Sequence, residues 1–294
     1  MTTGAKVSVV IPTLNAASEV GPLIESLKAQ TVAPAEIVVV DSESGDRTAE
    51  AAEAAGASRV IRIRRSEFNH GSTRHMALLE TSGELVCFLT QDALPADGAY
   101  LENLIRPLAR DPEVALASGR QLSRPGARRF VQLVQGFNYP DEPNVRGAGD
   151  VAAYGIKAFF ASDACSCYRR SAYLACGGFP AVETNEDMLM AARLIAAGYR
   201  VAYAPAAAVV HSHDLSPAEQ FRRNRAVGRF LEAHRGDLMG ASELGEGGRL
   251  VRAVAAQLLK EGAFGELLRF AADCAARLAG NRAGRRDARK ELNR

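Results

Sequence analysis

The sequence predicts an α/β fold in which a mostly parallel β-sheet is flanked by helices, with a C-terminal helical extension. In the first 118 residues, short apolar runs rich in β-branched residues alternate with segments of helical periodicity, as in parallel βαβ units. These apolar runs are unbroken, which indicates strands buried on both faces. After residue 235 the pattern is helical.

The elements of the first half follow from local patterns. Val7–Ile11 is an apolar strand closed by Pro12, and apolar residues then recur at helical spacing from Val20 to Leu27. Ser72 is suited to cap a later helix. The remaining predicted strands are Ile37–Val40, Val60–Ile63, Leu85–Leu89 and Val114–Ser118, and the remaining helices are Arg47–Ala55, Ser72–Glu80 and Gly98–Ala109.

The second half is less regular at first. Gly119–Phe160 carries several prolines and glycines and is predicted to be a flexible insertion. Regular elements then return as strands at Cys165–Tyr168 and Val201–Tyr203 and helices at Asp187–Ala197, Pro217–Ala233 and Arg249–Leu278.

Composition excludes several classes of protein. The net charge is only +2, so general nucleic-acid binding is not expected. The five cysteines form no zinc-binding pattern, and their odd number argues against a disulfide framework. The sequence opens without the pattern of a signal peptide, and no apolar run approaches the ~20 residues of a membrane span. We therefore expect a cytoplasmic protein.

Polar side chains stand at the ends of three predicted strands. Asn15 follows the first strand, Asp41 ends the second and Asp92 follows the fourth. Ligands of open parallel sheets bind at the carboxyl ends of the strands. The sequence therefore predicts a binding site at this edge of the sheet.

The loop after the second strand suits the recognition of a nucleoside. Asp41, Ser42 and Asp46 offer hydrogen-bonding groups to a base or ribose, although Asp46 is equally suited to cap the next helix. No glycine-rich turn follows the first strand, which argues against a dehydrogenase or methyltransferase of the Rossmann type.

Two further helix starts offer candidate groups. The helix after the third strand has unpaired backbone N–H groups at its N-terminus. Together with His70 and Arg74, these groups could bind a diphosphate or a sugar. A helix cap with a solvated arginine is an equal alternative. Glu186 and Asp187 open a later helix, where a carboxylate suits either a general base or the helix dipole.

Asp92 is the candidate ligand for a divalent metal ion. A Mg²⁺ or Mn²⁺ ion at a strand-end carboxylate would neutralise charge on a leaving diphosphate. His211 and His213 are candidates for a second ligand. Residues one apart on a strand point to opposite faces, so only one of the two is expected to reach the metal.

Together these segments resemble the family-2 glycosyltransferases of the GT-A fold, over Val7–Ala233. The family usually carries Asp-X-Asp after the fourth strand, whereas here Thr90 replaces the first aspartate and Asp92 keeps the second. The segments that carry the family resemblance are Val9–Asn15, Val40–Thr48, Gly177–Pro180 and Glu186–Asp187. Those that look like its rhamnosyltransferase branch are Phe68–Arg74, Leu89–Ala93 and His211–Asp214.

The resemblance implies a GT-A, Rossmann-like sheet and an inverting glycosyltransferase of surface-polysaccharide biosynthesis. Its donor would be dTDP-L-rhamnose, and its acceptor a saccharide or a polyprenyl-linked saccharide. Asp187 of the Glu186–Asp187 pair would act as the base. The resemblance also places Pro12, Thr13, Asn15 and Gln91 in the nucleotide site. Use of another nucleotide sugar, such as a UDP-hexose, and a non-catalytic nucleotide-binding protein are the alternatives.

The resemblance leads to a division of the chain. We predict a glycosyltransferase domain over residues 1–235, with a nucleotide-binding half (1–118) and an acceptor-side half (119–235). Residues 236–294 form a helical extension, whose last 19 residues hold seven Arg or Lys against two acids. Such a helix suits an anionic membrane surface, on the inner face of the cell membrane, or packing within the domain or a homodimer.

Overall fold

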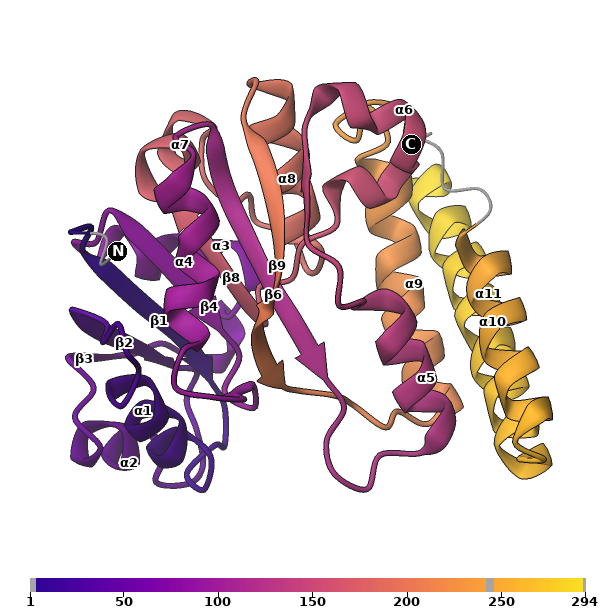
Figure 1. Cartoon of the computed structure of the whole chain (residues 1–294), viewed down its shortest axis with the longest axis horizontal. Helices are drawn as coiled ribbons and strands as arrows, with labels where there is room; N and C mark the ends of the chain where they lie inside the picture. The colour runs from indigo at the N-terminus through magenta and orange to yellow at the C-terminus, as the bar shows by residue number, and fades with distance from the viewer. Residues whose placement is uncertain (1–3, 242–245, 293–294) are drawn as a thin grey trace.

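The computed structural model describes residues 4–241 and 246–292, and Figure 1 shows a central sheet covered by helices on both faces. The strands follow the order β3-β2-β1-β4-β8-β6-β9-β5, and β7 pairs with β9. The strands are β1 (Val7–Thr13), β2 (Glu36–Asp41), β3 (Arg59–Arg62), β4 (Leu85–Leu89), β5 (Leu94–Pro95), β6 (Val114–Leu122), β7 (Asn144–Arg146), β8 (Cys165–Arg169) and β9 (Arg200–Val210). The predicted α/β sheet flanked by helices is confirmed, but the sheet is mixed instead of mostly parallel, because four of its eight strand pairings are antiparallel.

The helices cover the sheet in two layers and form a separate group at one end (Figure 1). They are α1 (Val20–Lys28), α2 (Thr48–Ala54), α3 (His70–Leu79), α4 (Tyr100–Arg110), α5 (Arg129–Asn138), α6 (Val151–Tyr154), α7 (Arg170–Ala175), α8 (Glu186–Ala196), α9 (Pro217–Ala233), α10 (Glu246–Lys260) and α11 (Phe264–Leu292). No helix within the described ranges combines the length and apolar character needed to cross a bilayer.

The alternation of β1 builds a core on each face of the sheet. Val9 and Ile11 pack with apolar residues of α1 and α4, whereas Val10 packs with those of α3 and α8. Every residue of β1 is buried, as its unbroken apolar run predicts. All five cysteines are free, and Cys87, Cys165 and Cys167 lie in this core.

Strand direction gathers several loops at one edge of the sheet. β1, β2, β3 and β4 are parallel, so Asp41 at the end of β2 and the loops that carry Asn15 and Asp92 lie at the same edge. β8 runs antiparallel to β4 and pairs Cys165 with Leu89, which brings the loop before β8 to that edge. β6 and β9 run in the direction of β4, so the loop after β9 joins them.

Four local expectations need correction. The segment Gly119–Phe160 is not an irregular insertion, because α5 buries Phe130 and Val134 against α10 and α11. The helix expected from Ser72 begins at His70, since the N-cap is Asn69. Strand β9 runs to Val210 instead of Tyr203. The helix expected over residues 249–278 is divided into α10 and α11, and Gly262 in the intervening turn has φ +66°.

Helix α11 packs closely on α9 through glycines. A β-carbon on Gly284 would overlap the backbone carbonyl of Arg225, and one on Gly280 would overlap that of Phe221. Gly228 of α9 faces the backbone of Asn281 in the same way. Helix α11 is therefore held against α9 by contacts that leave no room for a side chain.

This packing gives a stability prediction with a matched control. Gly284→Ala is expected to destabilise the protein by about 1–3 kcal/mol, because α11 must move away from α9. Gly265→Ala lies on the same helix in open space, so it is expected to be neutral or slightly stabilising. Urea unfolding of the two variants measures the difference, and equal stabilities would contradict the close packing.

Candidate active site

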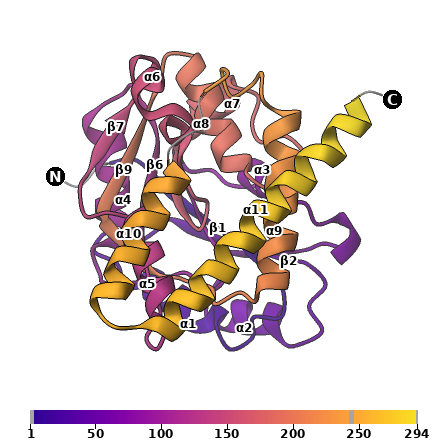
Figure 2. The same cartoon turned by 90° about the vertical axis from the view of Figure 1, so that its right-hand side faces the viewer.

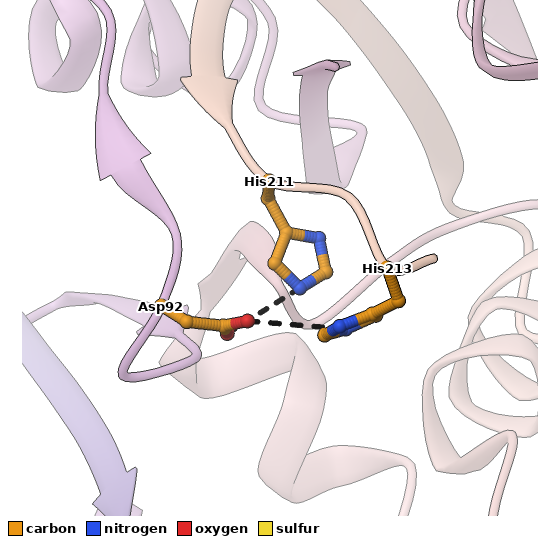
Figure 3. A group of neighbouring side chains, drawn as sticks. All are labelled: Asp92, His211 and His213. Atoms are coloured by element: carbon orange, nitrogen blue, oxygen red, sulfur yellow. Dashed lines mark ion pairs between the residues drawn. The ribbon is translucent and has the colours of Figure 1, made fainter. Parts of the chain in front are cut away.

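Asp92, His211 and His213 form a group that could hold a metal ion (Figure 3). Their candidate ligand atoms lie within 4.8 Å of one another. The Nε2 atom of His211 is 3.4 Å from Asp92 Oδ1, and that of His213 is 3.9 Å from Asp92 Oδ2. A carboxylate with two imidazoles leaves room for phosphate oxygens and water in the coordination of Mg²⁺ or Mn²⁺.

Both histidines point towards Asp92, so the expectation that they would face opposite sides is wrong (Figure 3). Strand β9 ends at Val210, and the two residues therefore lie in the following loop, where strand alternation does not apply. Their rings meet edge to face, with centroids 4.6 Å apart. The geometry therefore allows both imidazoles to contribute to one metal site.

Gln121 orients His211. Its Oε1 lies 2.9 Å from Nδ1 of His211, and its amide nitrogen donates to Ser162 Oγ at 2.8 Å. Because an amide oxygen only accepts, Nδ1 carries a proton in this contact, and Nε2 is the ring nitrogen directed at Asp92. Such outer hydrogen bonds fix the tautomer of metal-binding histidines.

The electrostatics of the group favour the ionised form of Asp92. Burial alone would raise the pKa of Asp92, but the hydrogen bond and charge of His211, with the charge of His213, hold that pKa well below its usual value. Burial and the charge of His211 lower the pKa of His213, against the opposite effect of Asp92. The ionised carboxylate is the form of Asp92 that binds a divalent cation.

Arg124 occupies the open side of Asp92. Its Nη2 donates to Asp92 Oδ2 at 3.0 Å and to the backbone carbonyl of Asp92 at 3.1 Å. The arginine is partly exposed, so this ion pair is weakened by solvent. A cation or a phosphate at Asp92 would compete with this contact.

The residues predicted to bind the nucleoside also tie two loops together. Asn15 Oδ1 accepts a hydrogen bond from Gly45 N at 2.8 Å, and Asp46 accepts from Ala17 N at 3.1 Å and from Thr48 N at 3.1 Å. Asp46 thus bonds the first backbone N–H of α2, although the N-cap position itself is Arg47. Pro12 and Thr13 lie in β1 beside this loop.

Asp41 and Ser42, at the end of β2, make few hydrogen bonds through their side chains. Asp41 is buried and accepts hydrogen bonds from the backbone and hydroxyl of Ser44. The buried hydroxyl of Ser42 has no hydrogen-bond partner. Gln91 is committed to the backbone of Leu14, accepting from its N–H at 2.7 Å and donating to its carbonyl at 3.1 Å. Gln91 thus joins the β1 and β4 loops.

Arg74 and Glu186 form a buried ion pair. Arg74 Nη1 lies 3.0 Å from Glu186 Oε1, and the side chains are only 4% and 7% exposed. Arg74 also contacts His70, with 3.2 Å between Nη1 and Nδ1. The alternative in which Arg74 is solvated is therefore wrong. The ion pair holds Glu186 at the start of α8, next to Asp187.

Asp187 lies beside a second buried carboxylate. Its Oδ2 accepts from Asp163 N at 3.2 Å, and its Oδ1 accepts from Met188 N at 2.7 Å. Burial, followed by the negative charges of Asp163 and Glu186, raises the pKa of Asp187 well above its usual value. Because Asp163 lies in the loop before β8, these contacts bring Asp187 to the edge that carries Asp92.

A cavity of about 270 Å³ opens beside the two histidines, between α5, α9 and α11. Its polar lining includes Gln135, Gln220, Asn224, Asp273 and Arg277. Arg223 of α9 also lines it and has no ion-pair partner among residues 4–241 and 246–292. Planar amide, carboxylate and guanidinium groups of this kind suit a ligand rich in hydroxyl groups.

Sequence reasoning missed Gln121, Arg124, Asp163 and Arg223. Asp163 sits just before a strand instead of just after one, and only the antiparallel direction of β8 brings it to the site. Gln121 lies in the last part of β6, which extends beyond the predicted Ser118 to Leu122, and Arg124 lies just after the strand. The polar stretch from Gly119 to Arg124, which follows an apolar run, is the sequence pattern that could have indicated Gln121 and Arg124.

Comparison with known proteins identifies relatives of this chain. Residues 8–176 match the family described as Glycosyl transferase family 2. The chain is 37% identical to the O-antigen chain rhamnosyltransferase RfbN of Salmonella typhimurium, over 88% of this chain and 83% of that protein. It is also 37% identical to the O-antigen chain rhamnosyltransferase WbaN of Salmonella anatum, over 87% and 82%.

Solved structures share the fold at lower sequence identity. The mannosyltransferase PcManGT of Pyrobaculum calidifontis, in complex with GDP-Man and Mn²⁺, superposes with a TM-score of 0.64 at 20% identity, covering 95% of this chain and 87% of that one. Glucosyl-3-phosphoglycerate synthase of Mycobacterium tuberculosis, with Mn²⁺ and UDP, gives a TM-score of 0.56 at 18% identity and 82% coverage of both chains. The fold is thus of the GT-A type.

Proposed function

The chain belongs to glycosyl transferase family 2, and we propose that it transfers L-rhamnose from dTDP-L-rhamnose to a saccharide acceptor during assembly of a surface polysaccharide. The observation that carries the choice of sugar is the 37% identity to two O-antigen chain rhamnosyltransferases over most of the chain. The glycosyltransferase activity itself follows from the family and these relatives. A lipid-linked acceptor at the inner face of the cell membrane is part of the same proposal.

In this proposal the nucleotide sugar lies along the carboxyl ends of β1, β2 and β4. Asp41 and Ser42 hold the nucleoside between the loops that Asn15 and Asp46 tie together. Asp92, with His211 and His213, would hold a divalent ion on the diphosphate. When bound, that ion supplies positive charge that stabilises the leaving diphosphate.

The transfer is a single displacement in this proposal. The acceptor oxygen forms a bond to the anomeric carbon while the bond from that carbon to the diphosphate oxygen breaks on the opposite face. Asp187 takes the proton of the acceptor hydroxyl, for which its raised pKa makes it a stronger base than an ordinary aspartate. Glu186 and Arg74 act as support, because their buried ion pair fixes the helix start that carries Asp187.

The acceptor side of this mechanism lies beyond the histidines. The polar cavity between α5, α9 and α11 supports a hydroxyl-rich ligand next to the metal group. Residues 1–118 serve the nucleotide and 119–235 the acceptor in this division. The extension over 236–294 adds Asp273 and Arg277 to the cavity wall.

A panel of sugar nucleotides tests the donor. We expect dTDP-L-rhamnose with Mn²⁺ to raise the thermal unfolding midpoint more than UDP-glucose or GDP-mannose does, and more than it does without Mn²⁺. At a hundred times its Kd, a ligand that binds only the folded state stabilises it by about 2.7 kcal/mol. A larger shift with a UDP-hexose would contradict rhamnose as the sugar, and no shift with any nucleotide sugar would contradict the site.

A further inference from the structure

The outward face of α11 carries an unpaired apolar stripe. Phe264 is 65% exposed, Leu268 74% and Leu278 53%. Ala271 and Ala275 are also exposed between them, so these five residues recur at spacings of four and three. The stripe lies on the side of the helix opposite Asp273, Gly280 and Gly284, which are buried against the rest of the protein. We call these five residues the α11 stripe.

Basic side chains continue the α11 stripe towards the C-terminus. Arg282 and Arg286 follow Leu278 along the same exposed face, since each further step is four residues. Neither arginine has an ion-pair partner among the described residues. The outer face of α11 is therefore apolar along its first half and cationic along its second.

The acids of α11 do not neutralise this face. Each acid within the described part of the helix pairs with an arginine, as Glu266 with Arg269, Asp273 with Arg277, Asp287 with Arg225 and Glu291 with Arg229. Two of those arginines belong to α9, which lies on the inner side. The pairing leaves the positive charge of Arg282 and Arg286 directed outward.

Figure 2 shows α10 and α11 crossing the front of one face of the molecule, with no other element over α11. On α10, Leu259 is 53% exposed and Val251 40% exposed. Exposed apolar side chains are therefore present on both helices. A helix with one apolar face and basic residues is the form that lies in the interface of an anionic membrane.

We propose that the α11 stripe, with Arg282 and Arg286, docks the protein on an anionic lipid bilayer. The apolar side chains enter the headgroup boundary, and the arginines contact lipid phosphates. A second copy of this chain is a poorer partner. Parallel pairing through this face would bring the unpaired arginines of both copies together, and antiparallel pairing would bury them against the apolar side chains of the other copy. The inner face of the same helix lines the cavity beside the histidines through Asp273 and Arg277. A membrane-docked α11 would thus bring a lipid-linked acceptor next to the metal group.

Vesicle sedimentation tests the docking surface without requiring sugar transfer, so its failure is separable from failure of the proposed function. The wild type is expected to sediment with vesicles of equal phosphatidylglycerol and phosphatidylcholine, and much less with phosphatidylcholine alone. Phe264→Glu with Leu268→Glu should reduce binding to the mixed vesicles at least tenfold. Arg282→Gln with Arg286→Gln should reduce it about tenfold or more and weaken its salt dependence.

Leu79→Glu is the matched control, because Leu79 is 52% exposed on α3, away from α11 in Figure 1. It should leave vesicle binding unchanged. All of the substituted side chains are exposed, so their thermal unfolding midpoints should match that of the wild type. A wild type that ignores anionic vesicles, or variants that bind as it does, would overturn the proposal. A dimer that the Phe264 and Leu268 substitutions dissociate would instead make the face an interface between copies.

Discussion

Replacing Asp187 with asparagine is expected to lower the rate of sugar transfer by about a hundredfold to ten-thousandfold, the usual contribution of a general base. The amide keeps the shape of the side chain and its hydrogen bond from Asp163 N but does not accept a proton from the acceptor. Binding of dTDP-L-rhamnose with Mn²⁺, measured by calorimetry, should stay within a few-fold of the wild type. Loss of transfer with intact donor binding separates the base from the nucleotide site.

The pH profile gives the second half of this prediction. Because burial and the charges of Asp163 and Glu186 raise the pKa of Asp187, the carboxylate form appears at higher pH than for an ordinary aspartate. Activity should therefore fall as the pH drops through this raised pKa. Asp163→Asn removes one of the negative charges and should shift the acidic limb to lower pH.

Glu183→Gln is the control for Asp187→Asn. Glu183 is an exposed carboxylate in the loop just before α8, so its loss should leave the rate and the pH profile unchanged. An Asp187→Asn variant that transfers sugar at the wild-type rate would remove the base from the mechanism. It would leave the metal group and the nucleoside loops untouched.

Asp92→Asn is expected to reduce transfer about a hundredfold or more at a fixed concentration of Mn²⁺. Asp92 is the only carboxylate of the metal group formed by the described residues, and two neutral imidazoles alone hold a hard cation weakly. Raising the Mn²⁺ concentration should recover part of the activity, which a variant that had lost its fold would not show.

Glu84→Gln gives a matched control for Asp92→Asn, since Glu84 is exposed at the opposite end of β4. Steady-state rates across a Mn²⁺ titration should overlay those of the wild type. Activity of Asp92→Asn equal to that of the wild type at low Mn²⁺ would place the cation elsewhere.

Much of the fold could be predicted because its signals are local. The apolar runs of β1, β2 and β4 indicate buried strands without any knowledge of distant contacts. Because these strands are parallel, Asp41 and Asp92 then lie at one edge of the sheet. Asp92 was therefore accessible to reasoning from sequence. The pairing of Arg74 with Glu186 was not, because each residue opens a different helix and only the packed structure brings them together.

Where prediction failed, long-range contacts decide the local structure. The length of β9 depends on its pairing with β6, where Val210 meets Leu122, and that length decides that His211 and His213 lie in a loop. Helix α5 is stable because Phe130 and Val134 bury against the extension, more than a hundred residues away. The prolines and glycines around it indicated a loop.

The central claim is that Asp92 and the two histidines hold a divalent cation on the donor diphosphate. Electron paramagnetic resonance of Mn²⁺ titrated into the protein with dTDP, against dTDP alone, tests it most directly. The wild type should bind one Mn²⁺ per chain, and Asp92→Asn and His211→Ala should each weaken that binding at least tenfold. Binding of Mn²⁺ by both variants with the affinity of the wild type would contradict the claim.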